Sequence, residues 1–120
     1  LVPMFPRKNG CSVVENKDIT ETKVKALAKA ADDCWGAIMR TDLKAFAAAY
    51  RASFEAQISM FPAMIQPGVQ DYINHYSAMD GVLAWKMPGA GGGGYLALVI
   101  ENANIFCQSV TEAIPLTIRR

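Results

Sequence analysis

A run of four consecutive glycines between two apolar segments is the feature that most limits what this 120-residue chain can fold into. The first segment, Val82 to Met87, ends at Pro88; the loop 89–94 then reads Gly-Ala-Gly-Gly-Gly-Gly, and the second segment follows as Tyr95 to Ile100. Short apolar runs bounded by proline and glycine are typical of buried strands. We therefore expect a β-hairpin with an almost bare tip, whose backbone can take positive φ angles and approach an anion closely.

Three familiar phosphate-binding loops do not fit this stretch. The spacing Gly89-x-Gly91-x-x-Gly94 matches the dinucleotide fingerprint, but that motif needs a helix directly after the loop, and a strand-like run follows instead. The Walker motif needs Lys-Ser/Thr where this chain has Tyr95-Leu96. The protein-kinase glycine loop needs a lysine on the following strand, and no lysine occurs after Lys86. A flexible linker remains the alternative on composition, although linkers are usually flanked by polar residues.

Composition places the chain among globular single domains. Hydrophobic residues make up 52% of it and charged residues 19%, which is enough apolar material for an ordinary core. The formal net charge is +1 with both signs interspersed, so no polybasic surface for nucleic acid or anionic membrane is expected. No apolar run approaches the roughly 18 residues that span a bilayer, and we expect no secretory leader.

The cysteines and the first residue give two further expectations. Cys11, Cys34 and Cys107 are irregularly spaced, which predicts neither a disulfide framework nor a zinc or other metal site. Free thiols in a reducing cytoplasm are the expected state. The sequence begins at Leu1 rather than at methionine, so we expect it to be part of a longer polypeptide.

Two long amphipathic helices are predicted before the hairpin. The first starts with a capping box over Asp18-Ile19-Thr20-Glu21. Its apolar side chains recur at helical spacing and are expected to be buried: Val24, Leu27, Ala28, Ala31, Trp35 and Ile38. The second starts with an N-cap at Thr41, followed by Asp42, and ends or kinks at Pro62. Its apolar stripe comprises Leu43, Phe46, Ala47, Tyr50, Phe54, Ile58 and Phe61. The sequence leaves open whether the chain breaks at Arg40-Thr41 or continues as one helix.

The remaining segments complete an α+β pattern. An edge strand is expected within Leu1 to Phe5, a third helix around Val69 to Tyr76, and a last helix capped by Asn102 or Asn104. Alternation at Leu116 and Ile118 predicts a closing strand. Taken together, the order is that of a ferredoxin-like split βαββαβ sandwich, an antiparallel sheet with helices on one face. The glycine loop then joins its two middle strands.

The stretch Trp85 to Leu96 resembles the third conserved motif of the GHMP kinases, the superfamily of galactokinase, homoserine kinase, mevalonate kinase and phosphomevalonate kinase. It is most similar to the sugar and sugar-phosphate kinases, such as heptose-phosphate kinase and fucokinase. The family's C-terminal domain is ferredoxin-like and carries this motif on a hairpin, so the resemblance implies one such domain over residues 1–120. Near the start, Phe5 to Ser12 resembles the Thr-Gly-x-Ser-Arg segment that opens the domain, which points to Arg7.

The resemblance implies ATP-dependent phosphoryl transfer to a hydroxyl group of a sugar or sugar phosphate, with ATP and Mg²⁺ as cofactors of the whole enzyme. Bare N–H groups from Gly91 to Gly94 would help to stabilise the transferred group. Lys86 and Arg7 are candidate contacts to phosphate or substrate. The complete candidate loop comprises Gly89, Ala90, Gly91, Gly92, Gly93 and Gly94.

Two departures from the family pattern limit what this chain can do alone. Pro88 replaces the family's Ser or Thr, which removes both a hydroxyl and an N–H. The family's nucleotide-binding loop, N-terminal lysine and catalytic aspartate are absent, so we expect no catalytic residue and no turnover in this piece. Its expected partners are an N-terminal kinase domain and the sugar substrate, with a homodimer as a further candidate.

Other residues carry weaker signals. His75 is the only histidine, and a lone helical histidine is usually a surface or packing residue. Adjacent Asp32 and Asp33 diverge around a helix and are expected on a solvated face. One rival to the kinase interpretation is a stand-alone ferredoxin-like regulatory module that binds a small metabolite, or its own copy through the sheet, with the glycine loop as an effector site. Another is a structural half-domain covered by a neighbouring domain.

Overall fold

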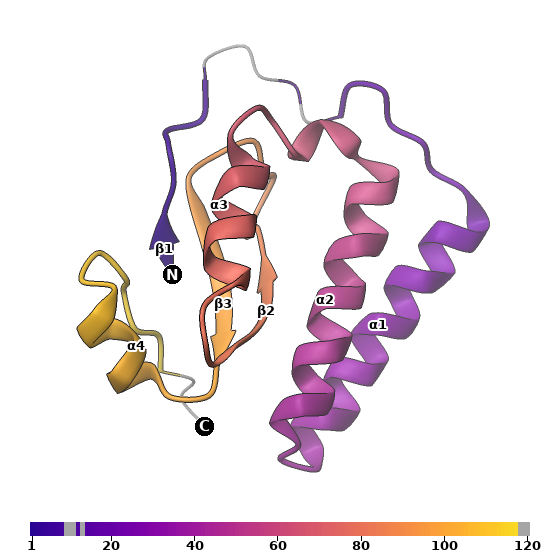
Figure 1. Cartoon of the computed structure of the whole chain (residues 1–120). Helices are drawn as coiled ribbons and strands as arrows, with labels where there is room; N and C mark the ends of the chain where they lie inside the picture. The colour runs from indigo at the N-terminus through magenta and orange to yellow at the C-terminus, as the bar shows by residue number, and fades with distance from the viewer. Residues whose placement is uncertain (9–11, 13, 118–120) are drawn as a thin grey trace.

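The computed structural model describes residues 1–8, 12 and 14–117, which form an α+β structure (Figure 1). This confirms the predicted class. Within those residues the elements follow in the order β1 (Val2–Pro3), α1 (Glu21–Met39), α2 (Leu43–Met60), the 3-10 helix η1 (Pro62–Met64), α3 (Val69–Ser77), β2 (Val82–Lys86), β3 (Tyr95–Ile100) and α4 (Ala103–Ser109). No helix of the described chain is long and apolar enough to cross a membrane.

The three strands form an antiparallel sheet in the order β1-β3-β2. The predicted hairpin is therefore present, with β3 in the centre of the sheet and β2 at one edge. Strand β1 pairs Val2 with Leu96 and Pro3 with Tyr95 at the other edge. This confirms the expected edge strand, where the missing N–H of Pro3 leaves no gap in the β1–β3 ladder.

The predicted closing strand is wrong at Leu116. Leu116 is not in a strand, and Ile118 lies outside the described residues. Instead, Leu1 and Ile114 exchange two backbone bonds, from the Leu1 ammonium to the Ile114 carbonyl oxygen at 2.8 Å and from the Ile114 N–H to the Leu1 carbonyl oxygen at 2.7 Å. Since Pro3 has no N–H to offer to the same neighbour, the pairing does not extend along β1.

Helix α1 begins two residues later than its capping box predicts. Thr20 is the N-cap, with Oγ1 accepting from the Lys23 N–H at 3.3 Å. Asp18 instead binds the Lys23 ammonium at 2.5 Å, and its own N–H donates to the Met60 carbonyl oxygen at 2.8 Å. The Asp18 carboxylate therefore pairs with a side chain of the first turn and does not cap the N–H groups of the helix.

A tight turn separates α1 from α2, which settles the question that the sequence leaves open. The N–H of Thr41 donates to the Ile38 carbonyl oxygen and that of Asp42 to the Ala37 carbonyl oxygen, the two bonds of a Schellman motif. Thr41 takes the left-handed position of this motif with φ 53°. Asp42, not Thr41, caps α2 by accepting from the Ala45 N–H at 3.0 Å.

The face of α1 that packs on α2 is not the one that the sequence predicts. Of the expected stripe only Leu27 is even half-buried; Val24, Ala28, Ala31, Trp35 and Ile38 are exposed, with Trp35 64% exposed. The covered side instead carries Lys23, Leu27, Ala30, Cys34 and Ala37. Small side chains at Ala30 and Ala37 let the two helices approach closely, which explains why this stripe faces α2.

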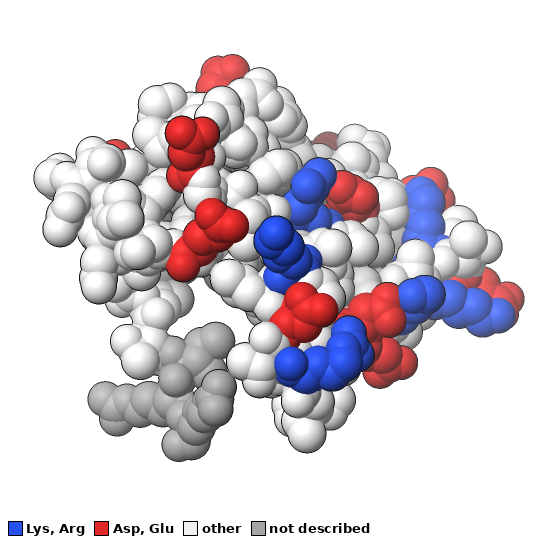
Figure 2. Space-filling view, turned by 60° about the horizontal axis from the view of Figure 1, so that its bottom comes forward, with Lys and Arg blue, Asp and Glu red and all other residues white. Residues whose placement is uncertain are grey.

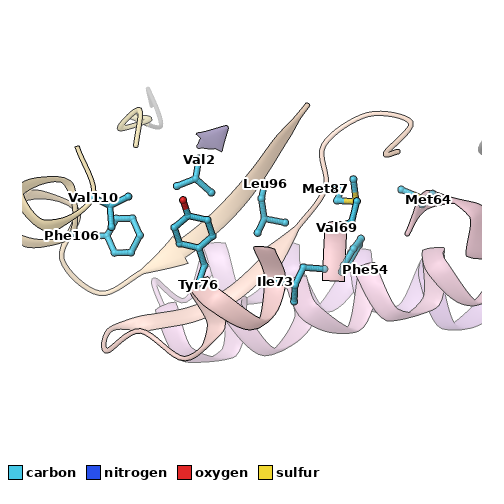
Figure 3. Packing of buried hydrophobic residues seen from close by; sticks show 10 residues of the cluster. All are labelled: Val2, Phe54, Met64, Val69, Ile73, Tyr76, Met87, Leu96, Phe106 and Val110. Carbon is cyan, nitrogen blue, oxygen red and sulfur yellow. The ribbon is translucent and has the colours of Figure 1, made fainter. Parts of the chain in front are cut away.

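The core lies between the sheet and helices α2 and α3, and α4 closes one end (Figure 3). In Figure 3 Val2 and Leu96 point from the sheet toward Ile73 and Tyr76 of α3. Phe54 confirms part of the predicted α2 stripe, whereas Leu43 is exposed. The buried cluster comprises Val2, Phe54, Met64, Val69, Ile73, Tyr76, Met87, Leu96, Phe106 and Val110.

Two caps fix the later helices. Gly68 precedes α3 with φ 93°, a conformation that favours glycine. Asn102 caps α4 by accepting from the Ile105 N–H at 3.1 Å, so it is the cap among the two asparagines considered. Tyr76 of α3 donates its hydroxyl to Glu112 at 3.1 Å, which ties the segment after α4 to the core.

Candidate functional site

The glycine loop between β2 and β3 owes its shape to backbone angles that other residues avoid. Gly89, Gly91, Gly92, Gly93 and Gly94 have φ angles of 70°, 75°, 80°, 147° and 85°. An L-residue with a side chain is strained at each of these values. Glycine is therefore required here by the path of the chain, whatever the loop binds.

Two of these glycines are also needed because other segments press against them. A Cβ atom on Gly91 would lie 2.9 Å from Met64 Cε, and one on Gly93 would lie 2.9 Å from the Phe5 carbonyl oxygen and 3.0 Å from the Arg7 nitrogen. The loop is thus held from behind by η1 and by the segment that follows β1. Residues far apart in the sequence close around it.

The expectation of bare N–H groups from Gly91 to Gly94 is wrong for two of the four. The N–H of Gly92 donates to the Met64 carbonyl oxygen at 3.0 Å, and the N–H of Gly94 donates to the Phe5 carbonyl oxygen at 2.8 Å. These amides hold the loop to the protein and cannot serve an anion at the same time. The exposed residues of the loop are Gly89 and Ala90, which follow the exposed Pro88.

Gly89 is a glycine of the loop that is both open and exposed. A Cβ atom built on it meets nothing within 4 Å. Pro88 supplies no N–H, so Gly89 and Ala90 are the exposed residues whose amides a ligand can approach. The candidate contact region is therefore smaller than the sequence predicts and lies at the start of the loop.

Arg7 is brought to the loop. Its backbone lies against Gly93, where a Cβ atom would come within 3.0 Å of the Arg7 nitrogen and 3.1 Å of its Cα. The residue as a whole is exposed. The structure therefore unites two regions that the sequence singles out separately, the segment after β1 and the hairpin tip.

Lys86 lies elsewhere, with its side chain toward α2. Its ammonium donates to Ser53 Oγ at 3.0 Å and lies 6.0 Å from the centre of the Tyr50 ring. Burial lowers the pKa of Lys86 below its ordinary value, while the nearby Cys34 acts in the opposite direction. Ser53 in turn donates its hydroxyl to the Tyr50 carbonyl oxygen at 2.8 Å. This cation therefore links β2 to α2 and is not directed at the exposed tip.

The polar partners of Lys86 were not predicted. Burial raises the pKa of both Tyr50 and Cys34 above their ordinary values. Tyr50 and Ser53 stand three residues apart on one helix, a spacing that puts them on one face. That spacing was the available signal, but nothing in the sequence shows which strand residue meets it.

The remaining candidates fit their simpler interpretations. His75 is exposed on α3 and lies edge-on to the Tyr76 ring at 4.9 Å. Asp33 pairs with Lys29 at 2.6 Å on the surface of α1. Over residues 1–8, 12 and 14–117, no group of three or more His, Cys, Asp or Glu side chains is arranged to hold a metal ion.

A hollow of about 450 Å³ lies at the other end of the sheet from the glycine loop, where β2 begins and β3 ends. Its apolar wall includes Ile100 and Phe106, and two carboxylate residues, Asp80 and Glu101, are among its lining. A smaller apolar hollow of about 100 Å³ lies between β1, β3 and α4. Neither hollow touches the glycine loop.

Comparison of the chain with protein-family models, curated proteins and solved structures gives no match. Function is therefore inferred from the residues described above.

Proposed function

We propose that this chain is the C-terminal domain of an ATP-dependent kinase of the GHMP type, acting on a hydroxyl group of a sugar or sugar phosphate. The observation that carries the proposal is the hairpin tip. Bonds from Gly92 and Gly94 fix the rear of the loop, while Gly89 and Ala90 stay exposed at its front. Amides held in place in this way need little reorganisation when charge develops near them.

The sheet supports the same proposal. Strands β1 and β2 are both antiparallel to β3, which lies between them. This is the arrangement of the first three strands of a split βαββαβ fold. The bonds between Leu1 and Ile114 put the C-terminal segment beside β1, where such a fold has its fourth strand. We propose a ferredoxin-like domain whose last strand is reduced to this one residue pair.

In the proposed reaction, the chain's own part is to position and stabilise the phosphoryl group. The amides of Gly89 and Ala90 would donate to phosphate oxygens, and the neighbouring Arg7 would add positive charge. When bound, ATP supplies the transferred group and Mg²⁺ neutralises part of its charge. The nucleotide loop and the residue that accepts the hydroxyl proton are assigned to an N-terminal domain, so this chain alone should show no turnover.

The direct test is a titration of the ¹⁵N-labelled chain with pyrophosphate and with ATP, followed by amide chemical shifts. The proposal expects the shifts to concentrate at Gly89, Ala90 and Arg7, and to weaken in Arg7→Ala. Shifts spread evenly over the surface, or none at the tip, would contradict it.

Activity is tested in a polypeptide that joins this chain to the N-terminal kinase domain that the proposal requires. Gly89→Val is the informative substitution there, because Gly89 is exposed and a Cβ atom built on it meets nothing within 4 Å. Gly92→Val is less informative, since Gly92 is buried and its N–H holds Met64. Loss of sugar phosphorylation is the expected result for Gly89→Val, with the fold retained by circular dichroism at the assay temperature despite a strain of about 1–2 kcal/mol at the positive φ. Full activity would remove the loop from the active site.

The second candidate is a small-molecule-binding module, and the hollow of about 450 Å³ beside α4 favours it. Apolar walls with a few polar groups are usual for ligand pockets. The same ¹⁵N-labelled chain separates the two candidates when it is titrated with a panel of amino acids and nucleotides. Shifts confined to Asp80, Glu101 and Asn102 would support the module and count against the kinase.

A further inference from the structure

Helix α1 carries an exposed apolar seam along its outer side. The seam consists of Val24, Ala28, Ala31, Trp35 and Ile38. The spacing between successive members alternates between four and three residues, which is the a and d pattern of a coiled coil. In Figure 1 α1 stands at the edge of the molecule, with α2 between it and the sheet, so the rest of the described chain leaves this side uncovered.

Such a seam is unusual on the free side of a helix. Surface helices normally turn polar residues to solvent. Here Trp35 is 64% exposed, Ile38 50% and Val24 48%, while the residues that face α2 are mostly small. A contiguous exposed apolar stripe of this kind marks an interaction surface.

We propose that this seam pairs with the same seam of a second copy of the chain, with the two α1 helices antiparallel. The small residues sit at the centre, so Ala28 of one copy would lie opposite Ala31 of the other. Trp35 would then lie opposite Val24 of the second copy at both ends of the contact. Alanine layers allow close approach of the helices, and the larger side chains close the two ends.

The charges beside the seam select the antiparallel arrangement. Lys25 and Asp32 lie one heptad apart on the same side of the seam, at its e positions. In an antiparallel pair Lys25 of each copy faces Asp32 of the other, giving two opposite-charge contacts. In a parallel pair e positions face g positions instead, and the g positions here are Leu27 and Cys34, so Lys25 and Asp32 would gain no opposite-charge contact. Lys25 already contacts Glu21 at 2.6 Å, but both side chains are exposed and such a pair is easily exchanged.

The wider surface fits this pairing. Figure 2 shows Lys, Arg, Asp and Glu side chains of both signs gathered on the side of the molecule that α1 and α2 form, with no single sign dominating. A surface of mixed sign does not repel its own copy as a strongly charged one would. A single helix face buries less than the roughly 1,200 Å² of a standard interface, so the dimer should be weak, with Kd in the micromolar range or above.

The test is sedimentation equilibrium of the chain from about 1 µM to about 1 mM. Asp32→Lys places lysines on both sides of each contact and should raise Kd at least about tenfold. The matched control is Asp33→Lys, the same change of charge at the next residue of α1. The side chain of residue 33 lies about 100° further around the helix and points away from the seam. Asp33→Lys should leave Kd within about twofold of the wild type.

The charge swap gives the decisive comparison. Lys25→Glu alone should weaken the dimer, and Lys25→Glu combined with Asp32→Lys should restore it, because the opposite charges then face each other again. Circular dichroism checks that α1 remains helical in each variant. A wild type that stays monomeric throughout, or a double variant no tighter than either single one, overturns the proposal. A monomeric wild type would mean that the seam binds a polypeptide segment other than a second copy of α1. None of these outcomes depends on the kinase proposal.

Discussion

Replacing Gly93 with alanine tests whether the N-terminal segment really closes on the glycine loop. Gly93 has φ 147°, and its added Cβ atom would meet two backbone groups, the Phe5 carbonyl oxygen at 2.9 Å and the Arg7 nitrogen at 3.0 Å. Backbone atoms cannot rotate away as the end of a flexible side chain can. Either the loop or the segment after β1 must therefore shift.

The expected loss follows from two additive causes. Holding a residue with a side chain in a φ region reserved for glycine costs of order 1–3 kcal/mol. Forcing an extra carbon into a closed contact costs about 1–3 kcal/mol more. Gly93→Ala should therefore lower the free energy of unfolding by about 2–6 kcal/mol, a large part of the 5–15 kcal/mol typical of a domain.

The matched control is Gly89→Ala, in the same loop. Gly89 also has a positive φ, 70°, but its Cβ atom would meet nothing within 4 Å. Only the backbone term applies, at about 1–2 kcal/mol. The assay is urea unfolding followed by far-UV circular dichroism, with the midpoint and slope fitted for both variants.

Hydrogen exchange locates the damage. The bonds from the Met4 N–H to the Gly94 carbonyl oxygen and from the Gly94 N–H to the Phe5 carbonyl oxygen should open first in Gly93→Ala. Equal losses for the two variants would mean that the Phe5 and Arg7 contacts do not confine the loop. The rear of the hairpin tip would then be fixed only by the bond from the Gly92 N–H to the Met64 carbonyl oxygen.

Three further predictions concern titration and backbone strain. Burial and the hydrogen bond to Glu112 raise the pKa of Tyr76 from 10.0 to about 12. The free energy of unfolding should therefore be full below about pH 10 and fall as the pH rises toward 12. Tyr76→Phe should abolish that fall and cost about 1 kcal/mol at neutral pH, as urea unfolding at several pH values would show. Burial lowers the pKa of Lys86, so the wild type should gain stability as pH rises toward 10.5. Lys86→Met should remove that gain without lowering the urea midpoint at pH 7, and a clear loss at pH 7 would show that the Ser53 contact outweighs desolvation. Thr41→Gly should raise the thermal midpoint through about 1 kcal/mol of relieved strain at φ 53°; an unchanged or lower midpoint would argue against the left-handed turn.

The sequence predicts the hairpin well because its signals are local. Pro88 and the glycines interrupt two apolar runs, and no distant residue is needed to place β2 and β3 on either side. The same holds for α4, whose cap Asn102 acts on Ile105 within one helical turn. Sequence patterns locate an element reliably when proline, glycine or a capping residue within a few positions defines its ends.

The face of α1 could not be predicted in the same way. Periodicity finds an apolar stripe, but α1 has two adjacent stripes, a large-residue one through Trp35 and a small-residue one through Ala30 and Ala37. Which stripe meets α2 depends on how closely the two helices approach, and this is a property of the pair. The sequence analysis assumed that the largest side chains are buried, and it therefore predicted that the stripe through Trp35 faces α2.

The site shows a related limit. Glycine content predicted a bare loop, but whether its N–H groups are available depends on Phe5 and Met64, which lie far away along the chain. The turn at Thr41 was uncertain because a Schellman motif usually shows itself by glycine, and threonine occupies the position here. In both cases tertiary contacts decide what a local pattern leaves undetermined.

The position of β1 has a consequence for how the chain folds and misfolds. The partners Val2 and Leu96 are separated by almost the whole chain, whereas α1–α2 and β2–β3 join neighbours. Closing so long a loop is slow, so β1 should dock last and detach first. Until it docks, the inner strand β3 presents an unpaired apolar edge around Leu96, which is a template for pairing between molecules. Aggregation during refolding should accordingly be governed by this two-residue strand more than by any of the helices.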